Sequence, residues 1–401
     1  MNPLLVSGFG ISIYVEKRKL IVKNRLKKEM LEFYPHQIDH DSIIIDGHTG
    51  NITFEAIRWL MKHNISLTIL NWNGNVLGVT LPKEPKAGKL KIAQYRAYLD
   101  TSKRLAIATE FVDQKIAHSH NLLNELARYY TEFDLEEIEK VFAQEKRKFD
   151  LGTKSVTSLM NHEGRIATYY WSVLARVFIK LYRQFHFEKR GSKSYSWNMN
   201  ASDEVNALLN YGYAVLESEV RKAINSIGLD PTIGFLHETA PSKEPLVYDI
   251  QELFRWLIDF SIIELLGQKK LRKSDFITTE NYHIRLTEKA AKLLLERISL
   301  DFNRKVSYKQ GKNFTYQNIL LDNVQQLSNY VLDKSEALSF KIPGVQIMRE
   351  ASLDIRKKIM DMTGEERKKL RINKSTLWYQ RKNIAEGKRI KVYDKLLSKL
   401  I

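Results

Sequence analysis

The sequence contains no cysteine. This absence excludes disulfide bonds, thiolate zinc sites and catalytic thiol nucleophiles. Long apolar runs are also missing, because the most apolar segment, 253–266, is interrupted by Arg255, Asp259 and Glu264 and therefore does not read as a membrane-spanning helix. The chain begins Met1-Asn2-Pro3, without the basic region and apolar stretch of a signal peptide. We therefore expect a soluble, cytoplasmic protein that has no membrane partner.

Acidic residues are scarce relative to basic ones. The 401 residues include 64 Lys and Arg against 47 Asp and Glu, which gives a formal net charge of +17. From Lys341 to Ile401 there are 17 basic and 7 acidic residues, so these 61 residues carry a net +10, more than half of the excess. A basic balance favours a polyanionic partner, although alone it does not distinguish DNA, RNA and membrane surface. Its concentration in the tail predicts nucleic-acid contact there.

The spacing of apolar residues predicts an α+β protein in three parts. Residues 1–85 read as a β-rich N-terminal domain with a helix near 53–62 and a hairpin turn at Asn73-Gly74. Residues 86–342 show helical spacing and predict a mostly α-helical domain, and residues 343–401 form the basic tail. The expected N-terminal strands are short runs of β-branched and apolar residues at 4–6, 11–15, 19–22, 42–45 and 66–70.

The tail predicts a C-terminal helix-turn-helix. Thr363-Gly364-Glu365-Glu366 is typical of a helix N-terminus with acids in its first turn. A turn at 371–374 would lead into a second helix, capped by Asn373 or Ser375, whose first residues would face a major groove. The alternative is a solvated basic helix pair that packs on the rest of the chain. The candidate DNA-binding residues are polar or basic and suit phosphates and base edges: Lys374, Ser375, Thr376, Tyr379, Gln380, Arg381 and Lys382.

One imidazole and two carboxylates lie close together in an apolar stretch. Gly234-Phe235-Leu236-His237 is followed by Asp249 and Glu252, which share a helix face because they are three residues apart. Unpaired charges beside a buried helix are costly, so these acids need a partner. A magnesium or manganese ion is one such partner, since imidazole and carboxylate groups bind both metals. The alternative is that His237 caps a loop and the acids pair with Arg255 or a lysine.

This stretch resembles the family of CRISPR spacer-acquisition integrases. The similarity consists of a turn at 228–231, then His237, then the pattern Tyr248-Asp249-x-x-Glu252-x-Phe254-Arg255. Trp256 departs from that pattern, since many relatives have proline there. The resemblance covers roughly residues 1–340, and ordered blocks are more specific than one motif. Two further blocks follow the family's order: Asn161-His162-Glu163-Gly164-Arg165-Ile166-Ala167 and Asn206-Ala207-Leu208-Leu209-Asn210-Tyr211-Gly212-Tyr213.

The resemblance implies a metal-dependent DNA integrase or endonuclease. In this interpretation Glu163, His237 and Asp249 bind Mg²⁺ or Mn²⁺, and Glu252 is an accessory catalytic acid. A 3′-hydroxyl of one double-stranded DNA end would attack a phosphodiester of target DNA, a transesterification that needs no protein nucleophile. Residues 86–342 would be the catalytic domain and residues 1–85 the dimerisation domain. The family further implies a prokaryotic homodimer that assembles further on DNA.

The basic tail separates three interpretations. A helix-turn-helix tail is typical of casposases, the transposon-encoded branch of the family, so the first is a casposase that joins transposon 3′ ends to target DNA. The second is a CRISPR adaptation integrase that inserts spacers into a repeat array beside a small partner protein. The third is a non-catalytic helix-turn-helix regulator, which would have no need for the intact set Glu163, His237 and Asp249.

Overall fold

The computed structural model describes residues 1–47, 49–71, 73–129, 134–150, 155–185, 187, 189–190, 200–239, 241, 243–280, 283–345, 347–350, 353–385 and 391–393. The chain divides into two units. The first unit contains Met1–Ser119 and Phe142–Pro343, and the second contains His120–Val141 and Gly344–Ile401. None of the helices in the described part of the chain has the length and apolar character that a membrane crossing would require.

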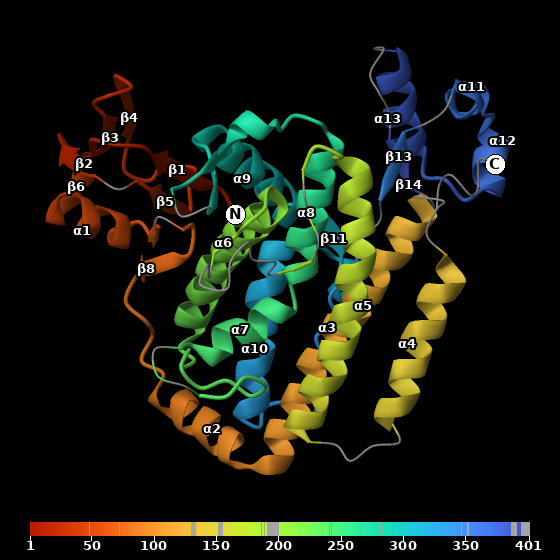
Figure 1. Cartoon of the computed structure of the whole chain (residues 1–401), viewed down its shortest axis with the longest axis horizontal. Helices are drawn as coiled ribbons and strands as arrows, with labels where there is room; N and C mark the ends of the chain where they lie inside the picture. The colour runs from red at the N-terminus through yellow and green to blue at the C-terminus, as the bar shows by residue number, and fades with distance from the viewer. Residues whose placement is uncertain are drawn as a thin grey trace. The chain divides into compact units, whose positions relative to one another are not determined.

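The N-terminal part of the first unit is β-rich, as predicted (Figure 1). One sheet has the order β1-β5-β7-β8, in which β8 alone runs antiparallel to its neighbour, and the other has the order β4-β3-β2-β6. Both sheets share an apolar core with α1 (Phe54–Lys62), which includes Ile13, Ile43 and Leu60. The strands are β1 Pro3–Ser7, β2 Ile11–Glu16, β3 Lys19–Asn24, β4 Glu29–Phe33, β5 Ser42–Asp46, β6 Gly50–Ile52, β7 Ser66–Leu70 and β8 Val76–Thr80.

All the strands expected from the sequence are present, and the hairpin prediction is confirmed because Asn73-Gly74 joins β7 to the antiparallel β8. Gly74 has φ of 82°, in the left-handed region that such turns require. Two strands were not predicted, β4 and β6. The residues of β4 are almost all exposed, so apolar alternation could not reveal this strand. Its pairing with β3 defines it instead.

The remainder of the first unit is mainly helical and surrounds α8 (Arg255–Gly267). All but three of the 13 residues of α8 are buried, as its apolar sequence predicted. It packs against α5, α6 and α9, and Figure 1 shows it between α5 and α6. Two helices, α3 Thr101–Tyr129 and α4 Leu135–Asp150, contain residues of both units. The other helices of the first unit are α2 Gly88–Leu99, α5 Val156–Leu181, α6 Glu204–Ile227, α7 Pro245–Glu252, α9 Glu288–Phe302 and α10 Tyr316–Val331, with short hairpins β9 Phe276–Thr278 to β10 Ile284–Leu286 and β11 Lys305–Ser307 to β12 Asn313–Thr315.

The turn at 228–231 redirects the chain between α6 and the segment that carries His237. Gly228 ends α6 with φ of 89°, and its N–H donates to the carbonyl of Ile224 at 2.9 Å. A Cβ at this position would lie 2.4 Å from the Cβ of Ala87, so only glycine fits both the backbone conformation and the packing. Pro245 then begins α7, where its missing N–H costs no helical hydrogen bond.

The described residues of the C-terminal part of the second unit include the helices α11 (Leu353–Asp361), α12 (Gly364–Lys369) and α13 (Lys374–Ala385). Thr363 and Glu366 form a capping box at the start of α12, which confirms the predicted helix N-terminus. The carbonyl of Asn373 accepts the N–H of Leu377 at 3.1 Å, so Asn373 occupies the cap position of α13 and Ser375 lies inside the helix. Two short strands of this unit, β13 Met348–Glu350 and β14 Lys391–Tyr393, pair antiparallel. Its helices enclose a small apolar core of Ile359, Met362, Ile372 and Leu377.

Arg381 takes part in the packing of this unit. Its Nε donates to the carbonyl of Ile359 at 2.9 Å, and its Nη2 donates to the carbonyl of Met362. These carbonyls lie at and just beyond the end of α11, where main-chain acceptors lack helical partners. Gln380 is half-buried. The exposed members of the predicted DNA-binding set are Lys374, Ser375, Thr376, Tyr379 and Lys382.

We expect Arg381→Ala to loosen the second unit, because it leaves two carbonyls without a charged donor. The cost should be about 1–3 kcal/mol, the usual penalty for an unsatisfied buried polar group. Hydrogen exchange followed by mass spectrometry should show faster exchange in α11 and α13. The control is Lys374→Ala, an exposed residue of the same helix. Equal exchange in both variants would mean that the Arg381 contacts contribute nothing.

Candidate functional site

Asp249 is completely buried and connects the segment 234–237 to α7. Its Oδ2 accepts the N–H groups of Phe235 at 2.5 Å and Leu236 at 3.0 Å. Its Oδ1 accepts the N–H of His237 at 3.0 Å and lies 2.7 Å from Nδ1 of the same residue. Both carboxylate oxygens are therefore fully engaged by donors within the protein.

Gly234 makes this close approach possible. A Cβ on Gly234 would lie 2.9 Å from Oδ2 of Asp249 and 2.6 Å from the Cβ of Pro245. Any other residue would push the loop away from α7 and lengthen the hydrogen bonds to the carboxylate. The glycine at the start of the motif is thus required by the contact between its own segment and the start of α7.

His237 is oriented by Asp249. Burial lowers the pKa of His237, but the hydrogen bond and charge of Asp249, together with the charge of Glu252, raise this pKa above its ordinary value. Because Nδ1 faces Asp249, Nε2 is the ring nitrogen that could bind a ligand. The side chain is 34% exposed, so a ligand has access to it.

Glu163 and Glu252 meet at the ammonium group of Lys115. Nζ of Lys115, on α3, lies 2.5 Å from Oε1 of Glu163, on α5, and 2.6 Å from Oε2 of Glu252, at the end of α7. Arg255 donates to the other oxygen of Glu252 at 2.9 Å. Burial raises the pKa of Glu252, but Arg255 and Lys115 lower it to about 2, so this carboxylate is ionised at neutral pH.

The structure brings the four predicted site residues together as two pairs, His237 with Asp249 and Glu163 with Glu252 through Lys115. Within the described ranges no three His, Asp or Glu side chains lie close enough to form a metal-binding cluster. The alternative drawn from the sequence, in which an acid pairs with Arg255 and a lysine, describes the contacts of Glu252.

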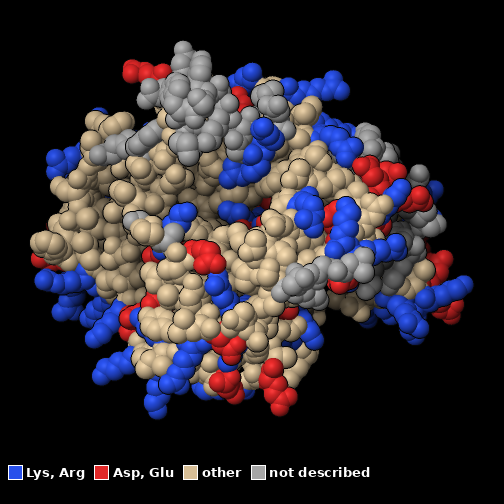
Figure 2. Space-filling model, turned by 60° about the horizontal axis from the view of Figure 1, so that its bottom comes forward, with Lys and Arg blue, Asp and Glu red and all other residues tan. Residues whose placement is uncertain are grey.

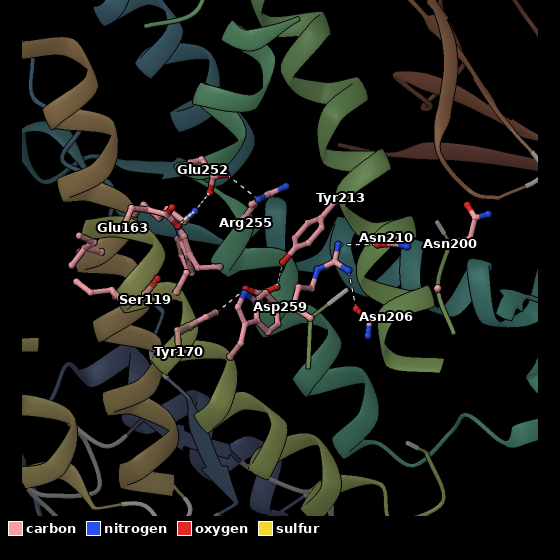
Figure 3. Close-up of a pocket in the computed structure, with 18 residues that line it drawn as sticks. Ser119, Glu163, Tyr170, Asn200, Asn206, Asn210, Tyr213, Glu252, Arg255 and Asp259 are labelled. Atoms are coloured by element: carbon pink, nitrogen blue, oxygen red, sulfur yellow. Dashed lines mark hydrogen bonds and ion pairs between the residues drawn. The ribbon is translucent and has the colours of Figure 1, made fainter. Parts of the chain in front are cut away.

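The residues present nevertheless fit a divalent cation. Oε2 of Glu252 is buried and accepts no hydrogen bond of good geometry, and its charge is met by the Lys115 ammonium. Two carboxylates that converge on one positive charge are ligands that suit Mg²⁺ or Mn²⁺, and the charges of Glu252 and Lys115 both act on the imidazole of His237. Figure 3 shows Glu163 and Glu252 reaching toward one another from different helices.

A pocket of about 380 Å³ adjoins these acids. Arg190 is held in its wall, where it donates to the Oδ1 atoms of Asn206 and Asn210, each at 2.8 Å. The guanidinium carbon of Arg190 lies 5.3 Å from the ring centre of Tyr213. The Asn-Ala-x-Leu-Asn-Tyr block thus positions an arginine, a role that its sequence did not reveal. Other lining residues include Lys115, Ser119, Glu163, Trp171, Glu252 and Arg255.

Asp259 lies in the same wall and was not predicted as a site residue. Tyr170 and Tyr213 donate to its two oxygens at 2.7 and 2.6 Å (Figure 3). Burial raises the pKa of Asp259 to about 6, and the two tyrosines, Arg255 and Arg190 offset this only in part. The available sequence signal was an acid inside an otherwise apolar helix, because a buried carboxyl needs partners.

The family of the chain follows from comparison with known proteins. Residues 4–299 match the family described as CRISPR associated protein Cas1. The chain belongs to the Cas1 family. The CRISPR-associated endonuclease Cas1 1 of Archaeoglobus fulgidus is 28% identical over 330 residues, which cover 79% of this chain and 93% of that protein. The protein of the same name from Francisella tularensis subsp. novicida is 27% identical over 335 residues, 82% of this chain and 95% of that protein.

Solved structures agree with this assignment. The structure of a casposase bound to integration product is 38% identical in sequence and has a TM-score of 0.78 to this structure. The aligned region covers 90% of this chain and 99% of that chain. The Cas1 protein of Thermotoga maritima, at 18% identity, shares the fold with a TM-score of 0.67 over 85% of this chain and 100% of that one. The resemblance inferred from the motifs is confirmed, and with it the enzyme class, a DNA integrase or endonuclease.

The raised pKa of Asp259 predicts a pH-dependent stability difference. Its folded pKa of about 6 exceeds the ordinary 3.8, so the folded protein binds this proton more tightly and loses stability as the pH rises between these values. Asp259→Asn removes that loss. Relative to wild type, the variant should gain on the order of 2–3 kcal/mol between pH 4 and pH 7, at about 1.4 kcal/mol per pKa unit.

Urea unfolding at several pH values measures this difference. The lost tyrosine hydrogen bonds add a constant offset, because the pKa values of Tyr170 and Tyr213 are raised well above 10 by burial and neither group titrates in this range. The matched control is Asp322→Asn, because Asp322 on α10 also accepts a tyrosine hydroxyl, that of Tyr308 at 2.9 Å. A stability difference between Asp259→Asn and wild type that stays constant with pH would contradict the assignment.

Proposed function

We propose that this Cas1-family integrase is a casposase, which joins a 3′-hydroxyl DNA end to target DNA. The observation that carries the proposal is the 38% identity to a casposase bound to integration product, over 90% of this chain. The unmatched tenth of 401 residues is about 40 residues, fewer than the 59 residues of segment 343–401. At least part of the basic tail therefore has a counterpart in the casposase. The second candidate, CRISPR adaptation, is supported by the CRISPR-associated relatives, whose identity to this chain is lower, at 27–28%.

We propose that Glu163, Glu252 and Nε2 of His237 bind the metal, Mg²⁺ or Mn²⁺, and that Asp249 positions His237. This division differs from the one that the resemblance implied, in which Asp249 was a ligand and Glu252 an accessory acid. The contacts of Asp249 support the change, since three backbone N–H groups and Nδ1 of His237 occupy its two oxygens and the side chain is 0% exposed. Glu163 and Glu252, in contrast, already share one cation, the Lys115 ammonium.

The reaction is a transesterification in which one P–O bond forms and another breaks. The attacking 3′-hydroxyl loses a proton and the leaving 3′-oxygen of the target gains one, so no external energy source or protein nucleophile is needed. When bound, the metal supplies charge to the phosphoryl oxygens and orients the reacting oxygens. Asp249 holds His237 in one orientation, and Arg255 keeps Glu252 ionised beside the pocket.

The role assignment is tested by Mn²⁺ binding and strand transfer in the same variants. We expect Glu163→Gln and Glu252→Gln to abolish joining of short 3′-hydroxyl duplexes to supercoiled plasmid and to remove measurable Mn²⁺ binding by electron paramagnetic resonance. Asp249→Asn should retain binding that is weakened about 10–100-fold, the usual effect of disturbing a residue that orients a ligand. The matched control is Glu217→Gln, an acid on α6 that pairs with Arg221.

Each outcome separates the candidates. Loss of Mn²⁺ binding in Asp249→Asn with retention in Glu252→Gln would restore the original ligand set. Joining that requires a small partner protein and a leader-repeat target would favour CRISPR adaptation. DNA binding without joining under either condition would favour the non-catalytic regulator.

We propose that α12 and α13 act as a helix-turn-helix that binds double-stranded DNA. The support is the exposed row of polar and basic side chains on α13 and the net charge of +10 over 341–401. Trp378, which was not among the predicted contacts, is 61% exposed, and Nζ of Lys382 lies 5.4 Å from its ring centre. The packing contacts of Arg381 make it a support for α13 rather than a DNA contact.

The net positive charge of the whole chain also favours DNA as its partner. Figure 2 shows lysine and arginine side chains spread over the displayed face, with acidic groups interspersed, in line with the net charge of +17. We also propose the homodimer that the resemblance implied, with residues 1–85 as its contact region. Light scattering after size exclusion, with and without DNA, measures this assembly.

The tail proposal predicts a change in salt dependence. The double substitution Lys374→Ala with Lys382→Ala should weaken duplex binding and lower the slope of log K against log salt by about 2, since each phosphate contact contributes about 0.9. Fluorescence anisotropy over a KCl series measures this slope. A control is Lys19→Ala, which removes an ion pair with Glu32 in the N-terminal sheet. An unchanged slope in the double variant would exclude phosphate contacts by these lysines.

A further inference from the structure

Two cations touch Glu252, and they are held very differently. Arg255 donates to Oε1 of Glu252, and its guanidinium carbon lies 4.8 Å from the ring centre of Tyr213, so its planar group is fixed on two sides. Lys115 contacts Oε2 of Glu252 and Oε1 of Glu163, and both contacts are ion pairs of its ammonium group. A lysine ammonium is a compact charge on a flexible four-carbon stem, whereas an arginine is planar and directional. Lys115 is therefore the cation that can move.

The surroundings of Lys115 provide room for that movement. Its side chain is 20% exposed and lines the pocket of about 380 Å³ beside the two acids. Arg255, Arg190 and Tyr213 occupy other parts of the same wall. The backbone of Lys115 belongs to α3, so we expect the ammonium to enter this space by rotation of its own side chain.

Charge balance explains why a lysine is placed there. Without a cation between them, Glu163 and the buried Glu252 would repel one another, and Glu252 would keep only Arg255 as a partner. Removing one partner of a buried ion pair is strongly destabilising. A divalent cation would satisfy the same two oxygens, so the ammonium and the metal compete for one position.

We propose that Lys115 is an internal counter-cation, which occupies the Glu163–Glu252 pair in the metal-free protein and moves into the adjoining pocket when a divalent cation binds. This inference rests on the proposed metal site. The Lys115 ammonium holds the two acids in place in the metal-free protein, but it lowers the affinity for the metal because the metal has to displace it. After metal binding, the displaced ammonium lies in the pocket together with the guanidinium groups of Arg190 and Arg255, which line its wall.

Isothermal titration of purified protein with Mn²⁺ tests the competition directly. Lys115→Met should bind Mn²⁺ about ten-fold more tightly than wild type, because no ammonium has to be displaced, and ten-fold corresponds to about 1.4 kcal/mol. In EDTA the variant should melt at a lower temperature than wild type, and Mn²⁺ should raise its melting temperature by more. Lys103→Met is the control, since Lys103 has a similarly covered side chain, 19% exposed, and pairs with Asp333.

A second measurement uses the wild-type protein. Brief acetylation of amines, read by mass spectrometry, should modify Lys115 several-fold faster when Mn²⁺ is saturating, whereas Lys103 should not change. Lys115→Gln provides a second variant for titration if Lys115→Met does not fold.

The outcomes separate this inference from the proposed function. Mn²⁺ binding in folded Lys115→Met that equals or falls below wild type would overturn the inference, as would unchanged acetylation of Lys115 in wild type. Mn²⁺ binding to wild type that survives Glu163→Gln and Glu252→Gln unaltered would instead overturn the proposed metal site, and the inference with it. Tighter binding in the variant and faster acetylation in wild type would together support the displacement.

Discussion

The buried carboxylate of Asp249 is the constraint on which the site depends. It is 0% exposed and accepts three backbone N–H groups as well as facing Nδ1 of His237. A carboxyl group in such a place is tolerated only when its oxygens accept hydrogen bonds. Because these donors all come from one short segment, the carboxylate fixes both the path of that segment and the direction of the imidazole. Glu252, three residues further along α7, is thereby placed at the pocket.

The pKa values of two buried acids in this region are shifted in opposite directions, for a clear physical reason. Glu252 contacts Lys115 and Arg255 directly, and these ion pairs lower its pKa to about 2. Asp259, seven residues later, accepts only the neutral hydroxyls of two tyrosines, and burial raises its pKa to about 6. Direct contact with a cation outweighs desolvation in the first case and is missing in the second. The pocket thus has one acid that is paired with cations and one that accepts hydrogen bonds from tyrosines.

In the second unit, a basic residue that the charge pattern predicted to contact DNA instead makes packing contacts within the protein. Its basic composition predicted that polar residues of α13 would meet DNA, and five of the seven named residues are exposed. Arg381 was chosen by the same reasoning, yet its guanidinium satisfies carbonyls around the end of α11. In a unit with a small apolar core, such a bond to the main chain contributes to the packing of the helices. The face available to DNA is therefore defined by burial within the unit.

The β-rich N-terminal part, the hairpin at Asn73-Gly74, the buried helix after Glu252 and the family of the chain could all be predicted from the amino-acid sequence. These features depend on local periodicity, turn chemistry and ordered motifs, and each of these signals comes from residues that are close together in the sequence. Three contacts became evident from the folded chain alone: Lys115 joins Glu163 to Glu252, Asp249 accepts the N–H groups of the segment 235–237, and Arg190 donates to Asn206 and Asn210. These contacts join residues from separate helices and loops. Their partners are selected by packing over long sequence separations, for which a single sequence carries no local signal.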